Sequence, residues 1–462
     1  MLSQQSKILV HFIGIGGIGM SGIAEILISL GYNVSGSDAA DSANVEKLRS
    51  MGATIHIGHA KENLSEQVTV VVYSSAVKDS NPEIIEAKSK QIPIMRRAEM
   101  LAELMRLKRG IAVAGTHGKT TTTSMLATIL QESGVDPTYI IGGIVNNLSG
   151  HAKVGEGQYL VAEADESDGT FLLLNPIMSV ITNVDNDHLD HYGSSEKLIE
   201  AFEQFANRIP FYGKCVLNAH DATLMTIAKN MKKPWSTFSI SDEGVSADFE
   251  AHHLMHQVSG CHYQLRVNGI DCGTVHIALP GRHNVLNSLG AIALAHQMGL
   301  QLEKIIAGIA KFEGVGRRMQ KILQTPELEV IDDYAHHPTE IATTLQAIRQ
   351  TRGDRQIIVI FEPHRFSRTR DCWKDFLHCF NQAHQLLLCP IYPASELPIA
   401  GITAEKLVED INQLHPQFAQ ILGGLDQIES ILRQTSSSPR TVVCLGAGAI
   451  SRRAREAVAR LS

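Results

Sequence analysis

A glycine-rich segment ending in a Lys-Thr pair is the first feature of this sequence that could do chemistry. Gly115-Thr116-His117-Gly118-Lys119-Thr120-Thr121 follows an apolar strand at 111–114 and opens a helical stretch at 120–132. It departs from the strict phosphate-loop pattern, because Val113 stands where the first glycine would be. Backbone N–H groups and Lys119 could still bind β and γ phosphates, and Thr120 could bind Mg2+. The alternative, a glycine turn with a surface lysine, is less consistent with strand, loop and helix occurring together.

Acidic residues follow two further predicted strands. The strand at 159–162 leads into Glu163-Ala164-Asp165-Glu166-Ser167-Asp168, and the strand at 178–182 leads into a segment that contains Asp187 and His188. Carboxyl ends of parallel strands meet at one edge of a sheet, so we expect these groups to converge on the glycine loop. Divalent cations bound to ATP need such carboxylates, and His188 could bind a second cation. The alternative for the first cluster is a solvated acidic loop.

A second glycine loop lies near the N-terminus. Gly14-Ile15-Gly16-Gly17-Ile18-Gly19 fits G-x-G-x-x-G between a strand at 7–12 and a helix at 21–30, and Asp38 follows the next strand, at 33–37. This arrangement predicts diphosphate binding at a helix N-terminus. It does not select NAD, because a nucleotide-diphosphate sugar would use the same loop, with Asp38 or Ser37 at its edge. A tight packing turn without ligand is the alternative.

The C-terminal third carries two more candidate segments at strand ends. Asp332-Asp333-Tyr334-Ala335-His336-His337-Pro338 precedes a helix that Pro338 can start. In 362–368, Arg365 and Arg368 could bind a carboxylate or phosphate bidentately, the alternative being paired surface arginines. Further upstream, Gly281 to Asn287 precedes an apolar helix, and Asn284 there could be either an N-cap or a nucleotide contact.

The elements that position these residues alternate between short apolar strands and helices almost throughout, which predicts an α/β fold with parallel sheets. We divide the chain into three domains. Residues 1–108 form a Rossmann-like domain, 109–315 a central phosphate-loop ATPase-like parallel sheet, and 316–462 a second Rossmann-like domain. Antiparallel alternation from about 247 to 279, with a hairpin at Asn268-Gly269, predicts a small added sheet in the central domain. Strands at 328–331, 356–361, 386–389 and 441–445 build the last one.

Composition narrows the class of protein. The 462 residues carry a net charge of -7, so no broad basic field exists to bind nucleic acid or an anionic membrane. The seven cysteines are scattered and never spaced as C-x-x-C, which favours reduced core residues over a disulfide framework or zinc site. We expect a cytoplasmic protein, with no membrane span, as a monomer or weak homodimer.

Together these motifs resemble the Mur ligases, the ATP-dependent amide ligases of peptidoglycan synthesis. The resemblance rests on Gly115 to Thr121, the acidic Glu163 to Asp168, Asp187-His188, Gly281 to Asn287, Gly316-Arg317-Arg318 and Asp332 to Pro338. It covers essentially the whole chain in matching order. The N-terminal glycine loop and His364 to Arg370 resemble the members that add L-alanine.

The resemblance implies an activity and a division of labour. The chain is expected to join L-alanine to the lactyl carboxylate of UDP-N-acetylmuramate through an acyl phosphate, using ATP and Mg2+. The N-terminal domain then binds the UDP-sugar, the central domain binds ATP, and the C-terminal domain binds the amino acid and part of the ATP. Closure of that last domain about Gly314 to Gly316 is expected before chemistry.

The resemblance also assigns roles to individual residues. It gives Lys119 the phosphates, Thr120 and Glu163 a first Mg2+, and His188 a second. Catalytic positions are expected at Lys119, Glu163, His188, Arg318, Asp333 and His336. ATP contacts are expected at Gly115, Thr116, His117, Gly118, Lys119, Thr120, Thr121, Asn284, Asn287, Arg318 and Asp333. Contacts to the substrates are expected at Gly16, Gly17, Ile18, Ser37, Asp38, Ser74, Ser75, Arg365 and Arg368.

Two departures and three alternatives accompany the resemblance. We find no lysine to match the carbamoylated metal-bridging lysine of some relatives, and Met319 stands where alanine-adding members often carry Phe. The main alternative function is a recycling ligase that adds a preformed peptide to the same sugar nucleotide. A non-catalytic, ATP-switched binding module is a second. A dehydrogenase is a third, and it leaves the phosphate loop and both acidic strand ends without a role.

Overall fold

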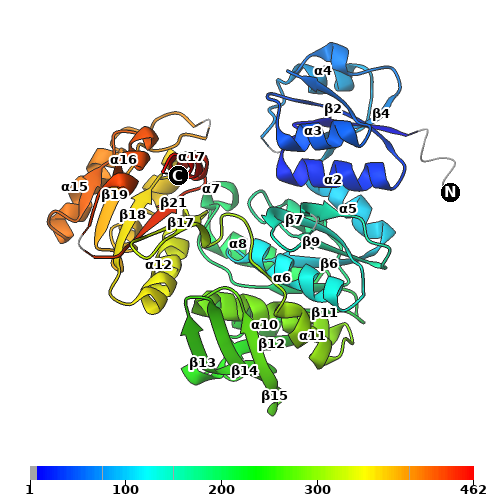
Figure 1. Cartoon of the computed structure of the whole chain (residues 1–462). Helices are drawn as coiled ribbons and strands as arrows, with labels where there is room; N and C mark the ends of the chain where they lie inside the picture. Colours follow the sequence, from blue (N-terminus) through cyan, green and yellow to red (C-terminus); the bar gives the residue numbers. More distant parts are fainter. Residues whose placement is uncertain (1–7, 75, 149, 395, 437, 462) are drawn as a thin grey trace. The chain divides into compact units, whose positions relative to one another are not determined.

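The computed structural model describes residues 8–461 except 75, 149, 395 and 437. The described strands form three sheets, of five, ten and six strands, with helices packed against them (Figure 1). The α/β fold class is therefore confirmed. The chain falls into two compact units, one of which holds Met1–His253, Tyr263–His276 and Leu286–Glu313, while the other holds Leu254–His262, Ile277–Val285 and Gly314–Ser462.

The N-terminal sheet is entirely parallel, with strand order β3-β2-β1-β4-β5. Its strands are β1 (Leu9–Ile13), β2 (Asn33–Asp38), β3 (Thr54–Ile57), β4 (Val68–Tyr73) and β5 (Ile94–Arg96). Its helices are α2 (Ile18–Ser29), α3 (Ala43–Ser50), α4 (Pro82–Ser89) and α5 (Arg97–Leu107). Alternating β1 residues face opposite ways: Val10 and Phe12 pack with α2, α3 and α5, whereas Ile13 packs with Ile84 of α4.

The ten-stranded sheet has the order β15-β14-β13-β12-β11-β10-β6-β9-β7-β8. Its strands are β6 (Arg109–Ala114), β7 (Thr138–Val145), β8 (Gly150–Lys153), β9 (Tyr159–Glu163), β10 (Met178–Ile181), β11 (Lys214–Asn218), β12 (Trp235–Ile240), β13 (Phe249–Gln257), β14 (Gly260–Val267) and β15 (Ile270–Ile277). The helices that accompany it are α6 (Lys119–Glu132), α7 (Leu189–Tyr192), α8 (Ser195–Ala206), α9 (Ala222–Asn230), α10 (Arg282–Gln297) and α11 (Leu302–Ile309). Because β6 lies between β9 and β10, three chemistry-bearing strand ends are neighbours.

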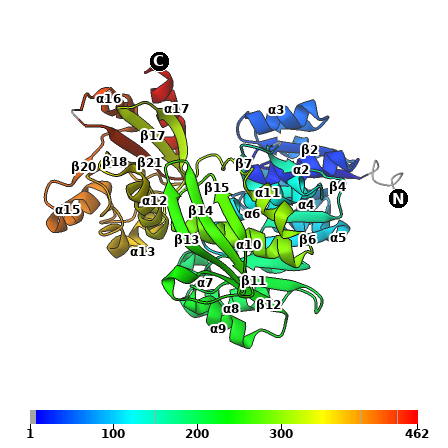
Figure 2. The same ribbon diagram turned by 60° about the horizontal axis from the view of Figure 1, so that its bottom comes forward.

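The predicted antiparallel strands are present, but they continue the main sheet rather than form a separate one. β12 pairs parallel with β13, with Phe238 opposite Phe249. Figure 2 brings β13, β14 and β15 to the front, where they extend the sheet beyond β12. The alternation of buried and half-buried residues in β14 indicates an antiparallel strand, but it carries no information about which edge of the sheet the strand joins.

The C-terminal sheet has the order β16-β17-β21-β18-β19-β20, and only β16 is antiparallel to its neighbour. Its strands are β16 (Gln320–Gln324), β17 (Leu328–Asp333), β18 (Gln356–Phe361), β19 (Gln385–Leu388), β20 (Ala419–Ile421) and β21 (Arg440–Leu445). Its helices are α12 (Pro338–Arg352), α13 (Phe366–Asp371), α14 (Trp373–Phe376), α15 (Ala404–Leu414), α16 (Ile428–Arg433) and α17 (Ile450–Ala459). Two apolar clusters cover its faces, with Val359 in one and Ile360 in the other.

A buried ion pair ties α12 to this sheet. Arg352 donates to both carboxylate oxygens of Glu329, at 3.0 and 2.9 Å, and the two side chains are 3% and 5% exposed. We expect Arg352→Met to lower the free energy of unfolding by about 3–5 kcal/mol, because it leaves the Glu329 charge buried and unpaired. Urea unfolding of the intact chain measures this loss. Adding Glu329→Gln to Arg352→Met should recover part of it, and full stability of the single variant would contradict the prediction.

Among the described residues, no helix combines the length and apolar character that crossing a bilayer requires.

Candidate active site

The phosphate-loop segment joins β6 to α6 and is clamped by the chain that leaves β10. The backbone N–H groups of Thr116 and His117 donate to Asn183 O and Oδ1, at 3.1 and 2.8 Å. The Thr182 hydroxyl donates to His117 O at 2.6 Å. The predicted convergence of these two strand ends therefore exists in the structure, and it fixes the path of the loop.

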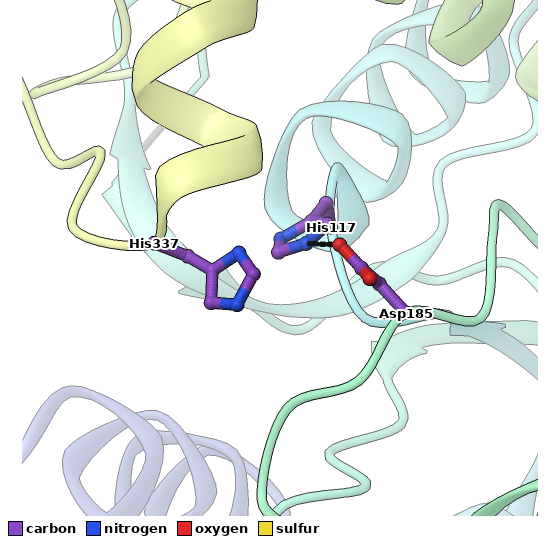
Figure 3. A group of neighbouring side chains, drawn as sticks. All are labelled: His117, Asp185 and His337. Atoms are coloured by element: carbon purple, nitrogen blue, oxygen red, sulfur yellow. Dashed lines mark hydrogen bonds and ion pairs between the residues drawn. The ribbon is translucent and has the colours of Figure 1, made fainter. Parts of the chain in front are cut away.

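His117 also reaches the β10 end through its side chain. Its Nε2 lies 3.0 Å from Asp185 Oδ2, as Figure 3 shows. The Asp185 N–H in turn donates to the Thr116 hydroxyl at 2.9 Å. These contacts hold the His117 side chain against the Asp185 segment, while its backbone remains part of the loop.

Two loop positions require glycine. Gly115 has φ +131°, and a Cβ there would lie 2.0 Å from Thr182 Oγ1. Gly118 has φ +82°, and a Cβ there would lie 2.4 Å from Asn287 Oδ1. Both are left-handed conformations that favour glycine. The second contact brings Asn287, a predicted ATP residue on α10, against the loop.

Lys119 is buried within the loop and paired with Glu166. Its Nζ donates to Gly115 O at 2.6 Å, to Thr116 O at 3.0 Å and to Glu166 Oε1 at 2.9 Å. The Lys119 side chain is 17% exposed and that of Glu166 only 1%. Burial alone would lower the pKa of Lys119, but the negative charges of Glu166 and Asp165 raise it. Lys119 is therefore a fixed cation at the start of α6.

The two groups predicted to share a metal ion are in contact. The Thr120 hydroxyl donates to Glu163 Oε2 at 3.2 Å, and the Gly142 N–H donates to Glu163 Oε1 at 2.6 Å. A Cβ at Gly142 would lie 2.9 Å from Glu163 Oε2, so the β7 backbone approaches this carboxylate closely. No motif in the sequence indicates that Gly142 contacts this carboxylate.

His188 is the N-cap residue of α7 and has a left-handed conformation, with φ +57°. Its Nε2 lies 3.5 Å from Asp187 Oδ2 and 3.8 Å from Glu166 Oε1. The side chain thus belongs to the same acidic cluster that surrounds Lys119. Of the other predicted ATP residues, Thr121 is buried in the first turn of α6.

Asn284 is not the N-cap of its helix, because α10 begins at Arg282. Its Nδ2 donates to Pro280 O at 2.8 Å, and the residue is buried. The capping alternative for Asn284 is therefore wrong.

The N-terminal glycine loop is fixed by the end of β2. The N–H groups of Gly14 and Ile15 donate to Ser37 O at 2.8 and 3.0 Å, and the Gly16 N–H donates to Asp38 Oδ2 at 2.8 Å. Gly17 is the N-cap position of α2, and Ile18 begins that helix and is 41% exposed. Asp38 thus holds the loop itself in this structure.

The Ser37 hydroxyl is turned into the interior. It donates to Glu83 Oε2 at 2.7 Å and lies 2.9 Å from His59 Nδ1. Glu83 is buried and also contacts His11 at 3.1 Å. Burial would raise the pKa of Glu83, but hydrogen bonds from His11, Ser37 and Asn63 lower it. Ser37 therefore supports the glycine loop through its carbonyl oxygen and anchors β2 through its side chain.

A cavity of about 510 Å3 opens between the N-terminal sheet and the acidic loop. It is lined by Tyr73, Val77, Lys78, Asp79, Arg96, Arg97, Ala98, Asp168, Thr170 and His191. Ser74 lies beside the cavity-lining Tyr73 and donates its N–H to Ile13 O at 3.2 Å. Ser75, also predicted to contact substrate, lies outside the described residues.

Arg97 is a cavity residue that sequence reasoning missed. Its NH2 donates to Asp165 Oδ2 at 3.0 Å, so it connects α5 to the acidic loop. A Cβ at Gly19 would lie 2.9 Å from Arg97 NH1, so the end of the Arg97 side chain lies close to the start of α2. The Arg96-Arg97 pair before a helix was the only available signal in the sequence.

In the C-terminal unit, Asp333 organises the end of β17. Its Oδ1 accepts the Ala335 N–H at 2.8 Å and its Oδ2 accepts the Met319 N–H at 2.7 Å. Burial raises the pKa of Asp333 to about 6, against the opposing effect of Arg318. Met319 is buried in the apolar cluster beneath α12.

Arg318 and His336 lie on the same side of this unit. The Arg318 guanidinium lies 5.2 Å from the centre of the Tyr334 ring and 4.0 Å from Glu340 Oε1. His336 Nδ1 lies 3.0 Å from Tyr334 O and 3.4 Å from Glu340 Oε2. The structure thus places Arg318, Asp333 and His336 in one region of this unit, around Tyr334 and Glu340.

Arg365 and Arg368 flank the start of α13. Arg365 has φ +73° and donates its N–H to Tyr392 O at 2.8 Å. The His364 ring stacks on Tyr392 at 5.4 Å, and burial together with both arginines lowers the pKa of His364 to about 4. Positive charge is therefore concentrated here without help from the histidine.

Comparison with known proteins agrees with this arrangement. Residues 9–109 match the model of the Mur ligase family catalytic domain, residues 113–295 the Mur ligase middle domain, and residues 317–448 the Mur ligase glutamate ligase domain. The chain belongs to the Mur ligase family.

Individual relatives match over nearly their full length. A UDP-N-acetylmuramate–L-alanine ligase from Geobacter sulfurreducens is 47% identical, covering 96% of this chain and 95% of the relative. One from Solidesulfovibrio magneticus is 48% identical with the same coverages. The crystal structure of a UDP-N-acetylmuramate-alanine ligase from Thermotoga maritima is similar, with a TM-score of 0.83, 30% identity, and coverage of 98% of this chain and 99% of that chain.

Proposed function

We propose that this chain is an ATP-dependent amide ligase that joins L-alanine to the lactyl carboxylate of UDP-N-acetylmuramate in peptidoglycan precursor synthesis, releasing ADP and phosphate. The observation that carries the proposal is the contact of Thr120 with Glu163 beside Lys119, at the end of a glycine loop. It occurs in a chain 47% identical to an L-alanine ligase.

The residues present fit ATP and Mg2+. The loop offers a buried cation, Lys119, and backbone that only glycine allows at Gly115 and Gly118. Thr120 and Glu163 are oxygen ligands already 3.2 Å apart, and His188 lies in the same acidic cluster. Bound Mg2+ would neutralise phosphate charge at this point. We also propose that ATP is contacted by Thr116, His117, Thr121, Asn284 and Asn287.

The cavity lined by Arg96, Arg97 and Lys78 supports the sugar-nucleotide part of the proposal. It lies in the same compact unit as both glycine loops, and it brings cations to a substrate that carries a diphosphate and a carboxylate. We infer that Gly16, Gly17, Ile18 and Ser74 lie along the diphosphate, with Asp38 at the edge of the loop, where it accepts the Gly16 N–H. Ser37 supports them from beneath.

In the proposed reaction the lactyl carboxylate attacks the γ-phosphorus of ATP, forming an acyl phosphate and releasing ADP. The alanine amine then attacks the acyl carbon, and phosphate leaves with the C–O bonding pair. Lys119 opposes the negative charge that gathers between phosphate and carboxylate. We assign to the C-terminal domain's part of the active site the residues Arg318, Asp333, His336, Arg365 and Arg368. We infer that this domain closes about Gly314 to Gly316 before the reaction.

The test is phosphate release from ATP and Mg2+ with UDP-N-acetylmuramate and single amino acids or a tripeptide, with product mass determined. Release that requires both the sugar nucleotide and L-alanine, with a mass gain of one alanyl residue, is expected. Release only with a tripeptide would identify a recycling ligase instead. Binding of both nucleotides without release would identify a non-catalytic module.

The recycling ligase is less consistent with the comparisons. A murein peptide ligase from Psychrobacter arcticus is similar in structure, with a TM-score of 0.72 and 26% identity over 98% of both chains. Both values are below those of the Thermotoga maritima alanine ligase. The alanine-adding reaction is therefore the one we propose.

Arg97 offers a test of the sugar-nucleotide site. We expect Arg97→Met to raise the KM for UDP-N-acetylmuramate about tenfold or more, because one charged hydrogen bond to the substrate is lost. Initial rates at saturating ATP and L-alanine measure this change. Arg106→Met, on the same helix and 65% exposed, is the matched control. An unchanged KM in Arg97→Met would remove Arg97 from the substrate site.

Two further expectations complete the proposal. We place the reaction in the cytoplasm, where ATP and nucleotide sugars are available. The expected monomer or weak homodimer is testable by sedimentation velocity across a range of concentrations. Phe211 and Tyr212, which are 81% and 65% exposed and contact each other, are the first residues to vary there.

A further inference from the structure

All three donors of the Lys119 ammonium are occupied within the protein. Two hydrogen bonds go to the carbonyl oxygens of Gly115 and Thr116, and the third goes to Glu166. The second Glu166 oxygen also lies 2.7 Å from Nζ. A phosphate oxygen can therefore bind this lysine only if one of the present partners gives way.

The Glu166 carboxylate is the partner that can move. The two carbonyl groups belong to the loop, whose path is fixed by hydrogen bonds to Thr182 and Asn183. The Glu166 backbone is held, because its carbonyl oxygen accepts the Tyr192 hydroxyl at 2.5 Å and the Gly169 N–H at 3.0 Å, whereas its carboxylate contacts Lys119 and lies 3.8 Å from His188 Nε2. Rotation of the side chain alone would release Lys119 without moving the loop.

We propose that Glu166 is a counter-ion latch for Lys119: it holds the lysine while the loop is empty and is displaced when nucleotide phosphates bind. The inference rests on the proposed binding of ATP at this loop. A carboxylate and a phosphate are both anionic acceptors for an ammonium, and the side chain of Glu166 is 1% exposed. Nucleotide binding thus replaces the Glu166 carboxylate with a phosphate at Lys119. Part of the free energy of nucleotide binding offsets the loss of the Lys119–Glu166 ion pair.

If Glu166 only supported the structure of the loop, replacing it would weaken ATP binding. If Glu166 is a latch, replacing it should strengthen ATP binding. We expect Glu166→Gln to bind ATP about tenfold more tightly than the parent chain, because the phosphates no longer compete with a buried carboxylate. The amide keeps the shape of the side chain and can still accept one hydrogen bond from Lys119. Titration calorimetry with ATP in EDTA excludes any contribution of bound metal.

A double-mutant cycle separates the latch from a general loss of negative charge. In a Lys119→Met background, adding Glu166→Gln should leave ATP affinity unchanged, because there is no ammonium group for which Glu166 and the phosphates could compete. Asp168→Asn removes one charge from the same loop, and the Asp168 carboxylate accepts hydrogen bonds from Thr170 rather than from Lys119. We expect it to change ATP affinity less than Glu166→Gln.

The outcomes are distinct. Weaker or unchanged ATP binding in Glu166→Gln, or an equal gain in the Lys119→Met background, overturns the latch. If Glu166→Gln does not fold, Glu166→Asp, which withdraws the carboxylate from Nζ, must bind ATP more tightly than the parent chain. Absence of ATP binding in every variant and in the parent chain refutes the proposed function as well, whereas binding by the parent chain without a gain refutes the latch alone.

Discussion

Replacing Lys119 with Met is expected to reduce ATP turnover about 10³-fold or more while leaving the fold intact. Lys119 is the buried cation at the glycine loop, and phosphoryl transfer depends on positioning and on neutralising charge. The measurement is phosphate release with UDP-N-acetylmuramate and L-alanine at saturating concentrations, alongside circular dichroism.

Lys229→Met is the matched control, since Lys229 is exposed on α9 and contributes the same charge to the chain. It should retain the turnover of the parent chain. If the turnover of Lys119→Met stays within tenfold of that of the parent chain, the Gly115–Thr121 loop does not take part in the reaction as proposed.

Replacing Glu163 with Gln is expected to lower kcat/KM about 10²- to 10³-fold and to raise the Mg2+ concentration required for half-maximal rate. The amide can still contact both Thr120 and the Gly142 N–H, so the local structure should persist while the charge is lost. Rates measured against Mg2+ concentration separate this effect from a change in ATP affinity.

Glu156→Gln serves as the control, because Glu156 is exposed just before β9 and bears the same charge. A shift in Mg2+ requirement of equal size in both variants would indicate a general charge effect. Parent-like Mg2+ dependence in Glu163→Gln would show that the carboxylate is not a ligand.

The strand-loop-helix elements around the chemistry could be predicted from sequence, because each combines a short apolar run with punctuating glycines. β18 coincides with the predicted strand at 356–361, and α6 begins one residue before the predicted start. The sequence analysis did not predict nine of the described strands, namely β3, β4, β5, β7, β8, β11, β12, β16 and β20. β3, for example, buries no residue fully, so it carries little hydrophobic pattern.

Side-chain partnerships were less accessible than strand ends. The convergence of the Gly115 loop with the segment after β10 follows from parallel topology alone. The pairing of Lys119 with Glu166, by contrast, depends on rotamers and on which loop carboxylate is buried. The contact of Arg97 with Asp165 spans 68 residues, and no local pattern signals it.

The closeness of α2 to the β7–β8 hairpin affects how this chain could be rebuilt from parts. A Cβ at Gly22 would lie 3.2 Å from the Ala152 Cβ, and next to it the Ser21 hydroxyl lies 3.1 Å from the buried His151 ring. The N-terminal domain therefore cannot be exchanged for that of another ligase without regard to these contacts. A chimera that takes residues 1–108 from another ligase would need a small residue at position 22 and a polar partner for His151. Without them, α2 would no longer pack against β8.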